Sequence, residues 1–115
     1  MAMYPFSNRH SHYHAHIYFD QETLNFAKQL RQSIRDEFDL EMGEFHQKTI
    51  GPHTRWSFSV TFENDSFAVL LDWLTQSCGD LSILIHALTG NDFEDHTQHA
   101  YWIGTPVPLD LSKLS

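Results

Sequence analysis

Histidines are concentrated in this chain, and four of them alternate near its start: His10, His12, His14 and His16. Successive side chains of a strand point to opposite faces, so an extended segment would place all four imidazoles on one face. His14 and His16 would lie roughly 7 Å apart along the backbone, from a rise of about 3.3 Å per residue. Two imidazoles at that spacing can converge on one metal ion, because metal–nitrogen bonds are only about 2.0–2.1 Å long.

The composition predicts one globular domain over residues 1–115, with residues 1–11 expected to be disordered. The chain is 41% apolar and 14% aromatic, which is typical of a protein with a packed core. Its formal charge of −8 argues against a nucleic-acid partner, because phosphate binding needs Lys and Arg. The sequence predicts no membrane span and no signal peptide. A single cysteine, Cys78, allows no internal disulfide, so we expect a cytoplasmic protein.

The elements that must position these histidines follow from the hydrophobic pattern. Alternation and clusters of β-branched and aromatic residues predict four strands, at residues 12–19, 40–49, 55–62 and 81–86. Asp20 is a good N-cap for a helix over residues 21–37. A second helix is expected to start after Asn64 or Asp65 and to end before Gly79. The remaining residues are expected to form a loop, a short helix or turn, and a final extended piece.

The order strand, helix, strand, strand, helix, strand predicts an α+β fold of the ferredoxin-like βαββαβ type. In that fold a four-stranded antiparallel sheet is covered by two helices on one face, and the other face stays open. The expected spatial order of the strands is 4-1-3-2. We take the first and third strands as parallel neighbours, with the fourth antiparallel beside the first.

This topology predicts that histidines from separate segments meet. The start of strand one, the start of strand three and the end of strand four would share one edge of the sheet. His14 and His16 lie in the first strand, His53 lies just before the third, and His86 closes the fourth. A cluster of this kind favours a metal or catalytic site over four unrelated surface residues.

Alternation also predicts which side chains face the open side of the sheet. If the apolar residues of each strand face the helices, three strands direct their histidines to the same open face. Strand two would add Glu44 and His46, provided that Phe45 is in the core. Ser57 and Ser82 lie on the same face and could accept hydrogen bonds from metal-bound imidazoles. For His10, His12, His46 and His99, an ordinary surface role is the favoured interpretation.

An all-imidazole site without thiolates suits zinc, iron(II), copper or nickel. Three histidines with an open coordination position would be a catalytic arrangement. Two histidines with one carboxylate would be that of a non-haem iron(II) oxygenase. Four carboxylates are candidates that the pattern does not place: Glu44, Glu94, Asp95 and Asp110.

Five motifs occur in order along nearly the whole chain. They are YHAHIYFD from Tyr13, GPH from Gly51, SILIHALTG from Ser82, DHT from Asp95 and YWIG from Tyr101. Together they resemble the DOPA 4,5-dioxygenase family of small ferredoxin-like proteins. The resemblance implies an extradiol ring-cleaving dioxygenase that inserts O2 beside the two hydroxyls of a catechol such as DOPA or a related aromatic acid.

The resemblance also implies the cofactor and the site residues. Iron(II) is the expected metal, with zinc or nickel as substitutes in purified protein. The corresponding histidines are His14, His16, His53 and His86, expected as metal ligands, and His96, expected as the catalytic base for a catechol hydroxyl. This chain has Thr54 and Ala87 where the family tends to have proline after the histidine, which leaves the substrate range open.

Two further side chains are predicted substrate contacts. Arg55 is expected on the open face, where it could pair with a substrate carboxylate, and a surface salt bridge is an equal alternative. Tyr18 is expected on the same face. The predicted partners are therefore a small aromatic molecule and O2. A homodimer is also expected, because a second copy would cover Leu84 on the open face.

Two other functions remain open from the residues. A non-catalytic module could keep the fold and bind a metal or a small ligand. A cofactor-free monooxygenase or isomerase is the third hypothesis, because open-faced ferredoxin-like domains carry many activities.

Overall fold

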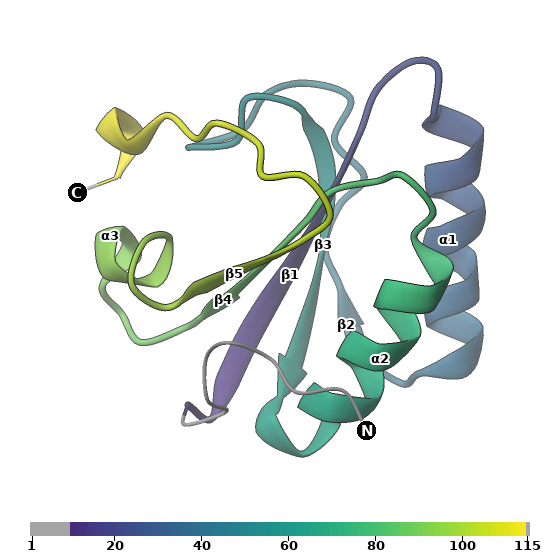
Figure 1. Ribbon diagram of the computed structural model, residues 1–115, viewed down its shortest axis with the longest axis horizontal. Helices are drawn as coiled ribbons and strands as arrows, with labels where there is room; N and C mark the ends of the chain where they lie inside the picture. Colours follow the sequence, from purple (N-terminus) through teal and green to yellow (C-terminus); the bar gives the residue numbers. More distant parts are fainter. Residues whose placement is uncertain (1–9, 115) are drawn as a thin grey trace.

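An antiparallel sheet of five strands forms the middle layer of the molecule in the computed structural model, which describes residues 10–114 (Figure 1). Two long helices cover one face, and a short helix and the C-terminal segment lie on the other side (Figure 1). Disorder was expected for residues 1–11, and residues 1–9 of that segment lie outside the described part. The strands are β1 (His12–Phe19), β2 (Glu41–Met42), β3 (Trp56–Glu63), β4 (Ile83–Ala87) and β5 (Ala100–Ile103).

The helix α1 (Leu24–Glu37) begins after a turn that Asp20 stabilises. The carboxylate Oδ1 of Asp20 accepts hydrogen bonds of 2.9 Å from both the backbone N–H and the hydroxyl of Thr23. The predicted start at residue 21 was therefore three residues early, because Asp20 caps the turn before the helix. The helix buries Ala27, Leu30 and Ile34 against the sheet, at the spacing of one helical face.

The second covering helix, α2 (Phe67–Ser77), follows a 3-10 turn at Asn64–Ser66, where the sequence pattern had placed the cap and the first residues of the helix. It buries Phe67, Leu70, Leu71 and Leu74. These residues pack against the core face of β1 and β3, where the rings of Tyr13 and Phe62 stack with centroids 5.5 Å apart. The predicted division of β1, β3 and β4 into core and open sides is confirmed by this packing.

The direction of β3 differs from the prediction, because β1 and β3 are antiparallel. The crossover through α1 returns the chain so that β2 runs in the same direction as β1, and β3 then runs back beside both. The start of β3 therefore lies beside the end of β1, where Trp56 pairs with Phe19. The predicted edge was therefore right for β1 and β4, where His14 pairs with His86, and wrong for the start of β3. His53 reaches the other histidines by a different route.

The sheet order β2-β3-β1-β4-β5 contains the predicted sequence of four strands and adds a fifth at the edge. The expectation of a four-stranded sheet was wrong because β5, predicted only as an extended piece, pairs with β4 along Ile83 to His86. The coarser class, α+β with an antiparallel sheet, is confirmed.

The predicted second strand, residues 40–49, is interrupted after two residues. Met42 pairs with Val60, yet the next bridge joins His46 to Ser57, so this segment holds one residue more than its partner. Such an extra residue is a β-bulge, which breaks the ladder and bends the strand. Because of this bulge, His46 lies opposite Ser57 on the open side of the sheet, where Phe45 would lie in a regular ladder.

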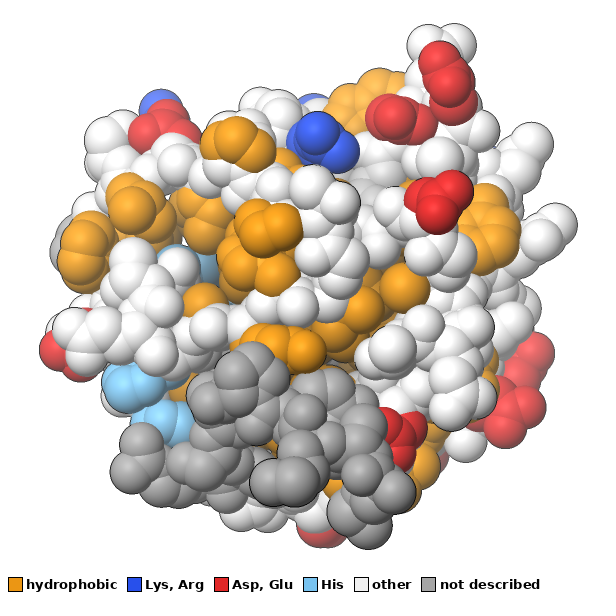
Figure 2. Space-filling model, viewed as in Figure 1, with side chains coloured by type: hydrophobic (Ala, Val, Ile, Leu, Met, Phe, Trp, Pro, Cys, Tyr) orange, Lys and Arg blue, Asp and Glu red, His pale blue; other side chains and the backbone are white. Residues whose placement is uncertain are grey.

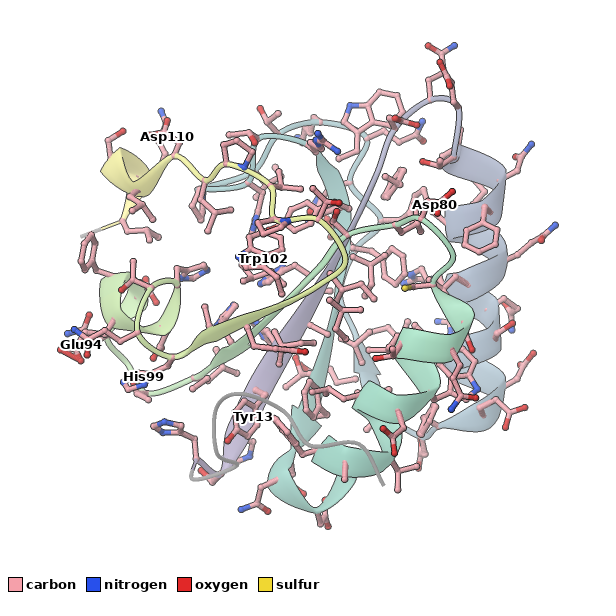
Figure 3. The ribbon with its side chains drawn as sticks, in the orientation of Figure 1. Tyr13, Asp80, Glu94, His99, Trp102 and Asp110 are labelled. Carbon is pink, nitrogen blue, oxygen red and sulfur yellow. The ribbon has the colours of Figure 1, made fainter. Side chains whose placement is uncertain are left out.

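The open face carries a second, smaller core. Tyr18, Leu84 and Val107 are buried there, with Trp102 and Leu109 packed against them (Trp102 is labelled in Figure 3). The C-terminal segment supplies this cover, so Leu84 is fully buried within one chain. The argument that a second copy must shield Leu84 was wrong, and the homodimer stays a prediction without that support. Over residues 10–114, the chain forms no helix with the length and apolar character needed to cross a membrane.

Candidate metal centre

Five histidines line one pocket of about 240 Å3 on the side of the sheet opposite α1 and α2. His14 and His16 come from β1, His86 from β4, His53 from the loop before β3, and His96 from the turn after α3 (Asp92–Asp95). The remaining walls are largely apolar and come from Ile50, Gly51, Pro52, Leu88, Asp92 and Leu114. The gathering of histidines that the sequence predicted is therefore observed.

The three histidines on the sheet form the more regular group. His14 lies directly opposite His86 in the antiparallel register, and His16 follows on the same face. The ring centroids are 5.3 Å apart for His14–His16 and for His14–His86, and 4.9 Å apart for His16–His86. Rings that share one ion through nitrogens at about 2.0–2.1 Å, with angles of about 90–110°, have centroids about 4.5–5.3 Å apart. These three rings match that spacing.

A second group of three contains His16, His53 and His96. Its ring centroids are 4.2 Å apart for His16–His53, 6.0 Å for His53–His96 and 6.3 Å for His16–His96. This triangle is much less even than that of the sheet histidines. His53 and His96 therefore lie at the side of the sheet group and could approach an ion, or a molecule bound to it.

Backbone carbonyls determine which nitrogen carries the proton in two of the rings. Nδ1 of His86 donates to the carbonyl of Ala87 at 2.8 Å, and Nδ1 of His96 donates to the carbonyl of Asp92 at 2.7 Å. Because a carbonyl only accepts, Nδ1 carries the proton and Nε2 keeps its lone pair in each neutral ring. Nε2 of His86 lies 2.9 Å from Nε2 of His16. The two nitrogens form a hydrogen bond, which Nε2 of His16 donates and Nε2 of His86 accepts.

The predicted hydroxyl partners of the histidines have other roles. Ser82 donates its hydroxyl to the carbonyl of Thr105 at 2.5 Å, and Ser57 is joined to His46 through the backbone. Sequence reasoning missed the carbonyls of Ala87 and Asp92. No residue type signals them, because every residue has a carbonyl and only the local backbone path directs it at a ring.

Tyr18 contacts His53 and is not open to a substrate. Its hydroxyl and Nδ1 of His53 form a hydrogen bond of 2.6 Å, and the Tyr18 side chain is only 2% exposed. The C-terminal segment also holds the loop that carries His53. Leu109 forms an antiparallel β-bridge with His53, and the Asp110 N–H donates to the carbonyl of Pro52 at 2.8 Å. His53 thus reaches His16 because its loop folds over the open face.

Burial keeps the central imidazoles neutral. Loss of hydration, helped by the nearby imidazoles of His96 and His14, lowers the pKa of His53 to about 4 and that of His86 to about 3. At His86 the Ala87 carbonyl and the Asp95 carboxylate oppose the shift without cancelling it. The pKa of His16 lies well below its ordinary value for the same two reasons, and that of His14 is also lowered. Neutral imidazoles are the form that binds metal, so these rings are ready to act as ligands near neutral pH.

The candidate carboxylates do not join the histidines. Asp95 is buried but accepts hydrogen bonds from the N–H and hydroxyl of Thr89, and Asp110 accepts them from Ser112. Glu94 lies 4.0 Å from His99 at the edge of the molecule (Figure 3). In residues 10–114, the groups of three that could hold an ion contain histidine alone, and Glu44 belongs to neither.

Arg55 also lies apart from the histidines. It lines another pocket with Phe19, Asp20 and Trp56. The histidines expected to have ordinary surface roles lie outside the histidine pocket as well: His12 pairs with Glu63 at 3.3 Å, and the His10 ring lies 4.7 Å from that of His99. His46 makes its backbone bridge to Ser57.

Comparison with known proteins identifies the family of this chain. Residues 13–113 match the Dopa 4,5-dioxygenase family. The chain belongs to this family. The match spans all five histidines of the pocket, so the resemblance noted from the motifs is confirmed.

Two curated relatives and one solved structure are similar to this family member. An uncharacterized 21.2 kDa protein of Botryotinia fuckeliana is 38% identical over 109 residues. The DOPA 4,5-dioxygenase of Amanita muscaria is 32% identical over 111 residues. These alignments cover 84% and 89% of this chain but only 60% and 49% of the relatives, so the chain spans about half the length of the curated proteins it matches.

The solved structure shares the fold over nearly its whole length. It is the 1.46 Å crystal structure of a candidate dioxygenase from Nostoc punctiforme PCC 73102, with a TM-score of 0.87, 30% identity, and 90% of each chain covered. This chain therefore shares its overall fold with that protein.

Proposed function

We propose that this chain is a metal-dependent extradiol dioxygenase that opens the ring of a catechol such as DOPA or a related aromatic acid. The observation that carries the proposal is the even triangle of His14, His16 and His86. A ring-opening enzyme needs a metal with free coordination positions, and three protein ligands leave such positions. The family supports the dioxygenase class.

The metal is proposed to be iron(II), held by His14, His16 and His86, with zinc or nickel as substitutes after purification. Imidazole ligands without thiolate suit all three ions. The donor set fits because loss of hydration lowers the pKa of all three rings, and because Nε2 of His86 carries no proton. A metal bound there would supply a Lewis acid that lowers the pKa of the catechol hydroxyls.

His53, which the family resemblance implies as a fourth ligand, is proposed to face the substrate side. Its ring is 4.2 Å from that of His16, closer than the spacing of two rings around one ion. The Tyr18 hydroxyl restrains the ring through Nδ1. This arrangement would hold His53 beside the substrate oxygens, where it can donate or accept a hydrogen bond.

His96 is proposed as the base that accepts a proton from the second catechol hydroxyl. Its Nδ1 donates to the Asp92 carbonyl, so Nε2 is the nitrogen that is free to accept. Its ring is 4.1 Å from that of His86, within reach of a molecule bound over the sheet histidines. The apolar walls from Ile50, Leu88 and Leu114 would exclude water around the ring.

The test is O2 uptake by protein that has been reconstituted anaerobically with iron(II) and then mixed with DOPA or a simpler catechol in oxygenated buffer. Ring opening consumes one O2 per catechol, places both oxygen atoms in the product, and gives a coloured semialdehyde. With 18O2, mass spectrometry should find both labelled atoms in the product. Metal uptake without O2 consumption would overturn the proposal in favour of a non-catalytic binding module.

A metal-free control separates the third hypothesis. If protein stripped of metal oxidises the substrate as fast as the reconstituted protein, the reaction does not depend on the histidine triangle. A cofactor-free oxygenase would then be the correct class.

A further inference from the structure

A second pocket of about 240 Å3 lies at the end of β1, apart from the histidines. Its lining residues are Phe19, Asp20, Gln21, Thr49, Thr54, Arg55 and Trp56. It shares no lining residue with the histidine pocket. Nothing in the proposed ring-opening chemistry uses it.

The register of the sheet brings two opposite charges to this pocket. Phe19 pairs with Trp56 as the last pair between β1 and β3. Asp20 follows Phe19, and Arg55 precedes Trp56, so the two charged residues flank this last pair and both line the pocket. The nearby Arg55 contributes to lowering the pKa of Asp20, after the larger effect of the hydrogen bonds from Thr23. The pocket therefore presents an anion and a cation side by side.

The Arg55 side chain is available to bind a ligand. In the described part of the chain its guanidinium has neither a hydrogen bond nor an ion pair, and it is exposed. A free guanidinium presents a planar set of donors that matches a carboxylate. In a chain with a formal charge of −8, basic side chains are few, and Figure 2 shows more acidic than basic side chains on the face that it draws.

The apolar wall of the pocket is aromatic. The rings of Phe19 and Trp56 lie edge to face, with centroids 6.0 Å apart, and Trp56 remains partly exposed. Aromatic side chains of this kind bind a further ring by stacking or edge contacts. The volume is below the range of about 300–1,000 Å3 that is typical for drug-sized ligands, so a single ring with a short polar group fits best.

We propose that this pocket is a second binding site, selective for an aromatic α-amino acid. The ligand carboxylate would pair with Arg55, its ammonium with Asp20, and its ring with Trp56. One feature of the pocket corresponds to each group of the ligand. A simple aromatic acid would satisfy Arg55 but meet the negative charge of Asp20, and an aromatic amine would satisfy Asp20 but meet Arg55.

The test uses metal-free protein and L-phenylalanine, which has no catechol hydroxyls. Binding is followed by two-dimensional 1H–15N NMR, with the Trp56 indole N–H and the Arg55 amide as reporters. We expect saturable shifts at these two residues, and weaker binding by about tenfold for 3-phenylpropanoate and for phenethylamine, since each loses one charge-assisted contact. Equal binding of all three ligands would overturn the proposal.

Two variants and a control locate the site. R55Q and D20N should each weaken phenylalanine binding by about tenfold, and D20N keeps a side-chain oxygen that can still accept from Thr23. R35Q, at the exposed end of α1, removes the same charge elsewhere and should bind as the wild type does. Shifts at Leu88 and His96 instead of Trp56 would place the ligand among the histidines and overturn the proposal. Because no metal and no catechol are present, the result is independent of the ring-opening assay.

Discussion

The sheet and the loops supply histidines of two kinds to the same pocket. His14, His16 and His86 are fixed by strand register, and their centroids differ in separation by only a few tenths of an ångström, from 4.9 to 5.3 Å. His53 and His96 come from loops, and their distances to the neighbouring rings run from 4.1 to 6.3 Å. A hydrogen-bonded ladder can hold an ion in fixed geometry, whereas a loop can adjust to a substrate. We therefore propose that the sheet histidines bind the metal and that the loop histidines handle protons.

The largest effect should come from removing a sheet histidine. H16A and H86A should each weaken iron(II) binding by more than about 100-fold, since even the outer partners of ligating histidines change metal affinity by about 10–100-fold. H53A should stay within about tenfold of the wild type. Anaerobic calorimetry or competition with a metal chelator measures these affinities.

H12A is the matched control for these variants, because His12 is an exposed histidine on the same strand that contacts Glu63. It should bind iron as the wild type does. If H53A loses the ion and H86A keeps it, the uneven group of His16, His53 and His96 holds the metal. If both variants lose it, His53 is a further ligand beside His86, and in either case the division between sheet and loops is wrong.

The next largest effect concerns the proposed base. H96Q should lower kcat for catechol ring opening by about 100- to 10,000-fold, the usual contribution of general acid–base catalysis. Its iron content should match that of the wild type, because His96 does not belong to the sheet group. Parallel measurements of O2 uptake and bound iron check both halves of this expectation, and a parallel loss of iron would assign His96 to the ligand set.

A smaller effect on kcat is expected from a change at Tyr18, which bonds to His53. Y18F removes only the hydroxyl that bonds Nδ1 of His53 at 2.6 Å and keeps the aromatic packing against Leu84 and Val107. We expect kcat to fall by about tenfold, at the lower end of the range for outer partners of site histidines, with an altered pH profile. Unchanged turnover and an unchanged pH profile would show that His53 needs no restraint from Tyr18.

The last effect concerns the stability of the metal-free protein. The folded pKa values of about 4 for His53 and about 3 for His86 lie below the ordinary 6.5, so the unfolded chain takes up protons that the folded chain does not. The stabilisation is fully present above pH 6.5 and is lost as the pH falls from 6.5 toward 4. Each unit of difference between the folded and unfolded pKa is worth about 1.4 kcal/mol once the pH is below both values.

Urea unfolding of metal-free protein at pH 7.5, 6 and 5 checks this sign. The midpoint should fall with pH in the wild type and in H12Q, and the fall should be shallower in H86Q. A steeper or equal fall in H86Q would contradict the assignment of this effect to His86.

Alternation along β1 was enough to predict which side chains face the pocket. His14 and His16 alternate with Tyr13, Ala15 and Ile17, which are buried. The same parity holds for His86 beside Ile85. This information is local, because the side-chain period of a strand depends only on the strand itself. The DHT motif also supplied His96, through the family resemblance.

Features that depend on distant contacts were not predictable in the same way. The route of His53 to the pocket depends on Leu109, Asp110 and Tyr18, which are far from it in sequence. The bulge before His46 and the pairing of β5 depend on partner strands. Arg55 was placed by alternation on the open face, but it precedes β3, so its position is decided by the loop.

Anomalous X-ray scattering from crystals of the iron-loaded protein, measured at the iron absorption edge, tests the central claim most directly. The account predicts one strong peak per chain, within bonding distance of Nε2 of His16 and His86 and of one ring nitrogen of His14. A peak bonded to His53 and His96 in place of His14 and His86, or no iron in the pocket at all, would contradict it.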